Sequence, residues 1–235
     1  MSIKAILFDL DGTLLPMDQE VFVKSYFKLL AAKMAPFGYE PTKLVESIWA
    51  GTAAMIRNDG SRSNEQAFWA KFTELCGPDA LKDKPTIDGF YSNEFNNAKE
   101  VCGFSPMART VIDRVKASGQ LAVLATNPIF PAVATENRIR WAGLSPEDFA
   151  LYTTYENSSY CKPNPKYFAE ILDKLGLRPE ECIMVGNDVT EDLAAAELGI
   201  PVFLLTDCLI NKEGKDISQI PNGGFETLDA YLAAL

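Results

Sequence analysis

Two aspartates, Asp9 and Asp11, stand two positions apart directly after a short apolar run. On an extended segment their side chains point to the same side, and Gly12 permits the tight turn that brings backbone N–H groups near a ligand. Carboxylates that share a site tend to have different pKa values, so one can act as a nucleophile and the other as a proton donor. An isolated pair of this kind is more often a loop whose acids cap a helix, so other residues must decide between the two interpretations.

Three further polar clusters lie farther along the chain. Thr126 and Asn127 carry a hydroxyl and an amide that can donate hydrogen bonds to phosphate oxygens, although Asn-Pro is also a common turn pair. Lys162 can supply the fixed cation that two aspartates and a phosphate require, although a lone lysine is more often a solvated surface residue. The segment 184–192 offers the hard oxygen ligands that Mg²⁺ requires, and Asn187 or Asp188 in it can also cap a helix.

Alternating strands and helices must position these clusters. Buried apolar runs predict strands at residues 3–8, 121–125, 151–154, 182–185 and 202–205. Capping residues and helical spacing predict helices at residues 106–118, 131–142, 165–176 and 190–198, while residues 21–98 show helical spacing without a convincing strand. This alternation predicts an α/β fold with a mostly parallel sheet, whose ligands lie outside the carboxyl ends of the strands.

The motif DxDGT at Asp9–Thr13, followed in order by Thr126, by Lys162 with its proline and by the acidic segment after Gly186, resembles the haloacid dehalogenase superfamily. The match is to its aspartate-nucleophile phosphatases. The resemblance implies a Rossmann-like core formed by residues 1–16 and 101–235 and an inserted α-helical cap over residues 17–100. This placement of the cap is similar to that in the phosphoglycolate phosphatase-like and β-phosphoglucomutase-like members of subfamily I.

The resemblance also implies a role for each motif residue. It makes Asp9 the nucleophile that attacks phosphorus, and Asp11 the acid that protonates the leaving oxygen and then activates water. It places Thr126 and Asn127 on the phosphate, and Lys162 on both the phosphate and Asp9. The catalytic residues are therefore predicted to be Asp9, Asp11 and Lys162.

The same resemblance implies a bound Mg²⁺ and leaves its ligands partly open. Asp9, the backbone carbonyl of Asp11 and a phosphate oxygen are predicted ligands, together with Asn187 or Asp188. The family normally has Asp directly after the glycine, whereas this chain has Asn187 there and the acid at Asp188. Because a charged oxygen binds a hard dication more strongly, we predict Asp188, while the family register favours Asn187. The second acid of the motif is Glu191 or Asp192, and we assign Asp192 a supporting role.

Composition narrows the function classes. The chain of 235 residues contains no histidine, which excludes Ser-His-Asp hydrolysis and histidine metal sites, and its five cysteines form no CxxC pair that would indicate zinc. Its net charge of −10 disfavours nucleic acid as a partner. The first residues fit neither a signal peptide nor a membrane span, so we expect a cytoplasmic protein without a membrane partner.

These observations predict a magnesium-dependent phosphohydrolase that acts on a small phosphorylated metabolite through an aspartyl-phosphate. The alternatives are a phosphomutase of the β-phosphoglucomutase type and a non-catalytic binding protein with the same fold, and a dehalogenase is disfavoured because members with that chemistry lack the second aspartate. Neither the substrate nor the oligomeric state is predicted. Five residues of the insertion are minor candidates for reading the substrate, namely Tyr39, Trp49, Arg57, Asn58 and Arg62.

Overall fold

The strands form one six-stranded sheet in the structure, a computed structural model that describes residues 2–235. Every strand pairing is parallel, and the order is β3-β2-β1-β4-β5-β6. The strands are β1 (Ala5–Phe8), β2 (Leu121–Leu124), β3 (Leu151–Tyr152), β4 (Cys182–Gly186), β5 (Val202–Leu205) and β6 (Asn222–Gly223). The predicted α/β class with a mostly parallel sheet is therefore confirmed.

The central strand β1 lies between β2 and β4, where the strand order reverses direction. Phe8, its last residue, pairs with Leu124 of β2 and Val185 of β4, so the residues that follow these three strands emerge at one edge of the sheet. Ligands of open α/β sheets bind at this reversal point, outside the carboxyl ends of the strands. The sheet topology therefore brings the clusters that follow β1, β2 and β4 together.

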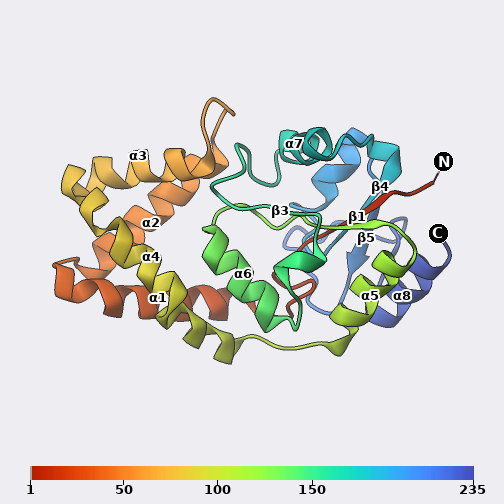
Figure 1. Ribbon diagram of the computed structural model, residues 1–235, viewed down its shortest axis with the longest axis horizontal. Coiled ribbons are helices and arrows are strands. Elements are labelled where there is room, and N and C mark those ends of the chain that lie inside the picture. Colours follow the sequence, from red (N-terminus) through yellow and green to blue (C-terminus); the bar gives the residue numbers. More distant parts are fainter. Residues whose placement is uncertain (1) are drawn as a thin grey trace.

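Alternate residues of the strands enter two separate cores, as the two-residue period of a strand requires. Ile6 and Phe8 point into the core that contains Leu228 of α8, whereas Leu7 belongs to the core that contains Phe168 of α7. Figure 1 shows helices on both faces of the sheet. These helices are α5 (Pro106–Ala117) and α8 (Phe225–Ala233) on one face, and α7 (Pro165–Leu175) and the 3₁₀ helix η6 (Leu193–Leu198) on the other.

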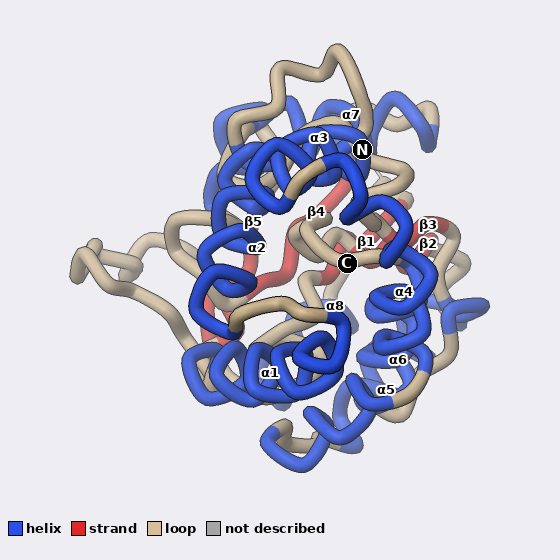
Figure 2. Tube along the Cα trace, turned by 90° about the vertical axis from the view of Figure 1, so that its left-hand side faces the viewer, coloured by secondary structure: helices blue, strands red, loops and turns tan. Residues whose placement is uncertain are grey.

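A group of helices between β1 and α5 lies beside the sheet (Figure 1), and Figure 2 looks onto it with the strands behind. Its elements are α1 (Gln19–Met34), η1 (Ala35–Phe37), α2 (Pro41–Ile56), α3 (Asn64–Cys76), η2 (Pro78–Asp83), α4 (Lys84–Ser92) and η3 (Glu94–Val101). It packs against α6 (Ala132–Trp141), with the rings of Phe95 and Trp141 centred 5.1 Å apart. The division into a core of residues 1–16 and 101–235 and a cap of residues 17–100 stays a prediction.

Three local features differ from the sequence-based expectation. The helix predicted at residues 190–198 is the tighter 3₁₀ helix η6, and turns precede it in which the Asp188 side chain accepts hydrogen bonds from the N–H groups of Thr190 and Glu191. The predicted strand at 151–154 is only two residues long. Strand β6 and helix α8 were not predicted, and the short 3₁₀ helices η4 (Pro146–Asp148) and η5 (Pro179–Glu181) complete the fold.

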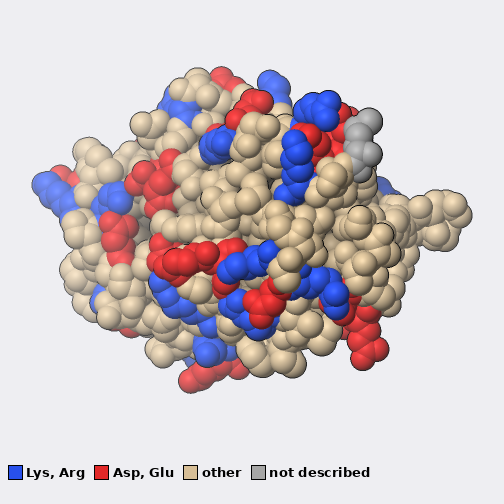
Figure 3. Space-filling view, turned by 45° about the vertical axis from the view of Figure 1, so that its right-hand side comes forward, with Lys and Arg blue, Asp and Glu red and all other residues tan. Residues whose placement is uncertain are grey.

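Acidic and basic side chains lie next to one another on the face drawn in Figure 3. All five cysteines are free thiols. Among residues 2–235, no helix combines the length and the apolar character needed to cross a bilayer.

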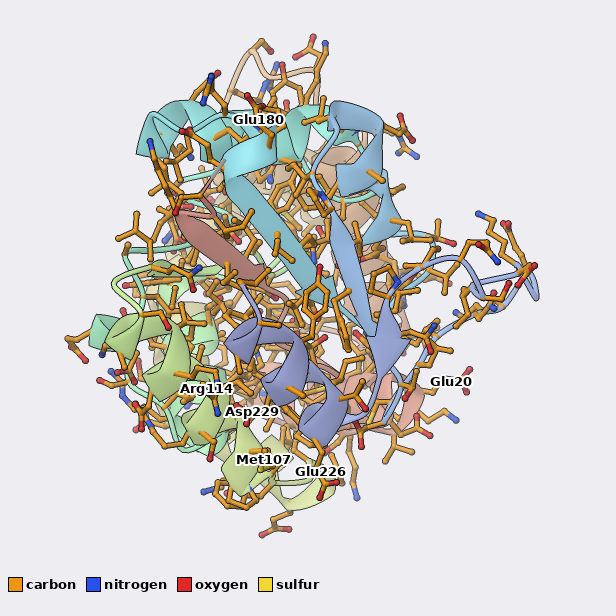
Figure 4. All side chains as sticks on the ribbon, turned by 90° about the vertical axis from the view of Figure 1, so that its right-hand side faces the viewer. Glu20, Met107, Arg114, Glu180, Glu226 and Asp229 are labelled. Carbon is orange, nitrogen blue, oxygen red and sulfur yellow. The ribbon has the colours of Figure 1, made fainter. Side chains whose placement is uncertain are left out.

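Helix α8 offers a test of what holds the last element on the sheet. Leu228 is completely buried, so Leu228→Ala should lower the free energy of unfolding by about 2–5 kcal/mol. Asp229, one residue later, points toward Arg114 of α5 with its Oδ2 2.7 Å from Nη2 (Figure 4), but this ion pair is partly exposed and is worth little. Asp229→Ala should therefore cost much less in urea unfolding. Equal losses would show that the ion pair, and not apolar burial, docks α8.

Candidate active site

Asp9 begins the loop that leaves the central strand. Its N–H donates to the carbonyl of Val185 at 2.9 Å, which extends the ladder between β1 and β4 by one residue. The hydroxyl of Thr13 lies 3.2 Å from Asp9 Oδ2 and 3.1 Å from Asn187 Oδ1, so it joins the loop after β1 to the loop after β4. Gly12 has φ +87°, and a Cβ at this position would collide with the amide of Asn187. The glycine of the motif is therefore required for the close approach of the two loops.

Lys162 connects Asp9 to a second buried carboxylate. Its Nζ lies 2.9 Å from Asp9 Oδ1 and 2.7 Å from Asp192 Oδ1, and the lysine side chain is completely enclosed. The second oxygen of Asp192 accepts the N–H of Asp188 at 2.9 Å, and a Cβ at Gly186 would collide with this carboxylate. Burial by itself disfavours a charged lysine, but the attraction of Asp192 and Asp9 outweighs it and raises the pKa of Lys162 well above its usual value.

Two carboxyl groups of the site have raised pKa values. Burial raises the pKa of Asp9 to about 7, because the lowering effect of Lys162 is outweighed by burial together with the repulsion from Asp192 and Asp11. Burial likewise raises the pKa of Glu191 to about 8, against the opposing attraction of Lys162. A divalent cation next to these groups would favour their charged forms, because opposite charge stabilises a carboxylate.

Thr126 and Asn127 follow β2 and face the same site. The carbonyl of Thr126 accepts hydrogen bonds from the hydroxyls of Thr153 at 2.6 Å and Tyr167 at 2.8 Å, which fixes the backbone behind the site. Its own hydroxyl makes no hydrogen bond to any of residues 2–235 and lines the pocket. The amide nitrogen of Asn127 donates to Glu191 Oε2 at 3.0 Å. One of the two N–H groups of this amide, which was predicted to bind phosphate, therefore already has a partner.

These side chains surround a pocket of about 600 Å³ that opens to solvent. Most of the predicted site residues line it, namely Asp9, Asp11, Thr126, Asn127, Asn187, Asp188 and Asp192. Lys162 is not part of this lining, because its ammonium is enclosed by Asp9 and Asp192. The structure thus shows its contact with Asp9, while its contact with phosphate stays a prediction.

Arg138 of α6 is a site residue that the sequence analysis missed. Only 1% of it is exposed, its Nη1 forms an ion pair with Asp11 Oδ2, and its guanidinium carbon lies 4.5 Å from the centre of the Phe130 ring. The other oxygen of Asp11 is buried without a hydrogen-bond partner among the described residues. The sequence contained one indication of this role. Arg138 stands four residues after Ala134 and therefore lies on the same buried face of the helix, where a charged side chain requires a partner.

The oxygen atoms of the site fit a magnesium ion better than a softer metal. Within residues 2–235 no three His, Cys, Asp or Glu side chains converge as a closed metal site, so a cation would have few carboxylate ligands and would also need amide or backbone oxygens. Mg²⁺ is bound in this way, because it retains several waters.

Asp188 Oδ1 already accepts two backbone N–H groups, whereas Asn187 Nδ2 donates to the carbonyl of Cys208 at 2.7 Å and its Oδ1 faces Thr13. The structure shows both candidates at the pocket, and the choice between them stays open.

Of the five candidates in the helical insertion, only Trp49 lines a pocket that adjoins the site. Arg57, Asn58 and Arg62 line a separate depression, and Tyr39 lines another. The amide of Asn58 is instead used within the structure, since it donates to Asn64 Oδ1 at 3.0 Å.

Comparison with known proteins adds independent findings. Residues 3–199 match the family model described as haloacid dehalogenase-like hydrolase. The glyceraldehyde 3-phosphate phosphatase of Methanothermobacter thermautotrophicus is 26% identical, over 93% of this chain and 95% of that protein. A phosphoglycolate phosphatase of Agrobacterium fabrum is 27% identical, over 85% of this chain and 79% of its own. Among solved structures, a 2-haloacid dehalogenase from Pseudomonas syringae pv. Tomato has the same fold, with a TM-score of 0.61 and 21% identity over 99% of both chains.

The raised pKa of Asp9 predicts how stability depends on pH when a chelator removes divalent cations. The pKa of Asp9 is about 4 in the unfolded protein and about 7 in the folded protein, so between these pH values only the folded protein keeps the proton of Asp9. This proton adds to the free energy of unfolding at low pH, and its contribution is lost as the pH rises toward 7. Asp9→Asn removes this contribution, and the free energy of unfolding should fall less steeply with pH, by up to about 1.4 kcal/mol per pH unit.

The exposed acid Glu20 supplies the control, and Glu20→Gln should retain the slope of the unmodified protein. Urea unfolding at several pH values measures both slopes. Identical slopes for Asp9→Asn and the unmodified protein would contradict the raised pKa.

Proposed function

The chain belongs to the haloacid dehalogenase-like hydrolase family, and on this premise we propose that it is a magnesium-dependent phosphatase of small metabolites that transfers the phosphoryl group to Asp9. The observation that carries the proposal is the position of Asp9. It lies at the carboxyl end of the central strand, on a pocket that also exposes Asp11, and Lys162 holds one of its oxygens from the buried side. A carboxylate fixed in this way needs little reorientation to attack a bound phosphate.

In the first step the oxygen of Asp9 that Lys162 does not hold forms a bond to phosphorus. The bond from phosphorus to the ester oxygen breaks, and the departing alcohol takes a proton from Asp11. Asp11 Oδ2 is paired with Arg138, whereas Oδ1 is buried and has no hydrogen-bond partner among residues 2–235. Asp11 would therefore have to turn toward the leaving oxygen to donate this proton, and Arg138 would hold the acid in place until then.

In the second step a water molecule attacks phosphorus and gives a proton to Asp11. The bond between Asp9 and phosphorus breaks, inorganic phosphate leaves, and both aspartates return to their starting states. The free hydroxyl of Thr126 would donate to a phosphate oxygen throughout, since it lines the pocket and its backbone is fixed by two hydrogen bonds.

Asp9, the backbone carbonyl of Asp11 and either Asn187 or Asp188 would hold Mg²⁺, which when bound offsets the negative charge of the carboxylates and the phosphate. Five carboxylates line the pocket, and Lys162 and Arg138, the cations that contact Asp9 and Asp11, are both already paired. Asp192 would act indirectly, by holding Lys162 against Asp9. The two phosphatase relatives act, by their names, on small phosphorylated compounds, which supports a metabolite substrate.

Asp11→Asn tests the role of the second aspartate. An amide cannot supply the proton, so release of the alcohol from an alkyl phosphate in the first turnover should fall by about 10²–10⁴-fold. The loss should be smaller for release of nitrophenol from nitrophenyl phosphate, whose leaving group departs without a proton. Asp9→Asn is the matched control and should abolish release from both esters. Equal losses of Asp11→Asn on both esters would argue against Asp11 as the acid, and transfer of the phosphoryl group to a sugar instead of water would indicate a mutase.

Magnesium titration tests the choice between Asn187 and Asp188. If charge selects the ligand, Asp188→Asn should raise the Mg²⁺ concentration for half-maximal activity by at least about tenfold, whereas Asn187→Ala should change it little. The amide in Asp188→Asn keeps an oxygen that can cap the N–H groups of Thr190 and Glu191, so a folding defect is avoided. The opposite result, a large shift for Asn187→Ala alone, would show that position in the motif selects the ligand.

A further inference from the structure

A second pocket opens directly beside the catalytic one. Val23 of α1, together with Ile129 and Phe130 after β2, lines both pockets. A group attached to a phosphate at Asp9 can therefore extend past these three residues into the second pocket.

The wall of this second pocket carries no charge. None of its lining residues, all of which the structure describes, is Lys, Arg, Asp or Glu, and eight of the fourteen are aromatic. Phe68 and Trp69 of α3 meet edge to face with ring centres 5.5 Å apart, and the ring of Tyr155 is centred 6.4 Å from that of Phe68. Such a surface gains free energy by burying apolar atoms and loses it by burying unpaired charge.

Two cations that lie over rings of this wall are already paired. Lys84 lies over the ring of Trp69, but its Nζ is 3.0 Å from Asp88 Oδ2 and is therefore paired. Arg138 stacks on Phe130 and is paired with Asp11. A carboxylate or a second phosphate on the substrate would thus enter the pocket without a free cation, and burying it there would be costly.

Two polar features of the wall indicate what the pocket can recognise. The hydroxyls of Tyr26 and Tyr91 lie 2.8 Å apart and satisfy each other, and burial raises the pKa of Tyr26 to about 12, so the pair is uncharged at neutral pH. Trp69 is only 7% exposed, and its Nε1 makes no well-formed hydrogen bond to a described residue, although the Tyr155 hydroxyl lies beside it. An indole N–H can only donate, so an oxygen acceptor on the ligand would take this N–H in place of Tyr155.

We propose that the second pocket holds the alcohol part of the substrate, and that the substrate is a phosphate monoester of an uncharged, largely apolar alcohol with an aromatic-sized group and one oxygen acceptor for Trp69. This inference rests on the proposed phosphatase function and names its substrate class. Short phosphorylated acids are disfavoured because their carboxylate lacks a partner here. Sugar phosphates are disfavoured because most of their hydroxyls would be buried without hydrogen bonds.

Four phosphate esters and Mg²⁺ provide the test, with released phosphate as the readout. 2-Phenoxyethyl phosphate and 3-phenylpropyl phosphate have the same shape and differ only in an ether oxygen, and phosphoglycolate and glucose 6-phosphate represent the disfavoured classes. We expect kcat/KM for both aromatic esters to exceed that for the other two by at least about 100-fold. The phenoxyethyl ester should be the better of the aromatic pair.

Trp69→Phe keeps an aromatic ring and removes the N–H. It should lower kcat/KM for the phenoxyethyl ester by about tenfold, the value of one hydrogen bond, and change that for the phenylpropyl ester little. Tyr39→Phe is the matched control, because it also removes one hydrogen-bond donor from the helical part but lines a different depression. It should leave the ratio of the two esters unchanged.

The outcomes separate the inference from the function on which it rests. Phosphate release that is fastest from phosphoglycolate or glucose 6-phosphate would overturn the substrate class and leave the phosphatase function intact. Equal losses of both aromatic esters in Trp69→Phe would overturn the assignment of an acceptor to Trp69. Absence of phosphate release from all four esters and from nitrophenyl phosphate would overturn the proposed function and the inference together.

Discussion

The ammonium of Lys162, enclosed between Asp9 and Asp192, is the interaction on which the rest of the site depends. A fully buried lysine is stable only with paired carboxylates, and removal of one partner of a buried ion pair is strongly destabilising. Asp192 can reach the ammonium because Gly186 has no side chain to block its carboxylate. Asp9 can reach it because it directly follows the central strand. The parallel order of the strands, the glycine at the end of β4 and the orientation of the nucleophile thus follow from the same requirement.

Two pockets of different character lie side by side at the site, and three residues line both of them. The catalytic pocket is lined by five carboxylates and attracts cations, whereas the adjoining pocket has an uncharged aromatic wall. Phe130 and its neighbours form the boundary, and Arg138, which stacks on Phe130, pairs with Asp11. A phosphate ester fits this arrangement with its charged end at Asp9 and its alcohol in the aromatic pocket. The charge distribution therefore separates the chemistry from the recognition of the substrate.

Much of this arrangement could be predicted from the sequence. Asp9, Thr126 and Asp188 each follow an apolar run that forms a strand, and parallel strands place such residues at one edge. Arg138 could not be assigned because its partner, Asp11, lies 127 residues away and only the packing of α6 brings them together. The aromatic pocket was missed for a similar reason, because its wall is assembled from several helices and the loop after β2. Local patterns thus predicted the strand ends, while contacts made by helix packing needed the structure.

The central claim is that Asp9 carries the phosphoryl group during turnover. The Asp11→Asn variant should accumulate this species, because it retains the nucleophile and lacks the group that activates water. After incubation with nitrophenyl phosphate and Mg²⁺ and an acid quench, peptide mass spectrometry should find the mass of one phosphoryl group on Asp9, and the variant that also carries Asp9→Asn should lack it. Release of phosphate by Asp11→Asn without any such adduct, or with the adduct on another residue, would contradict the account.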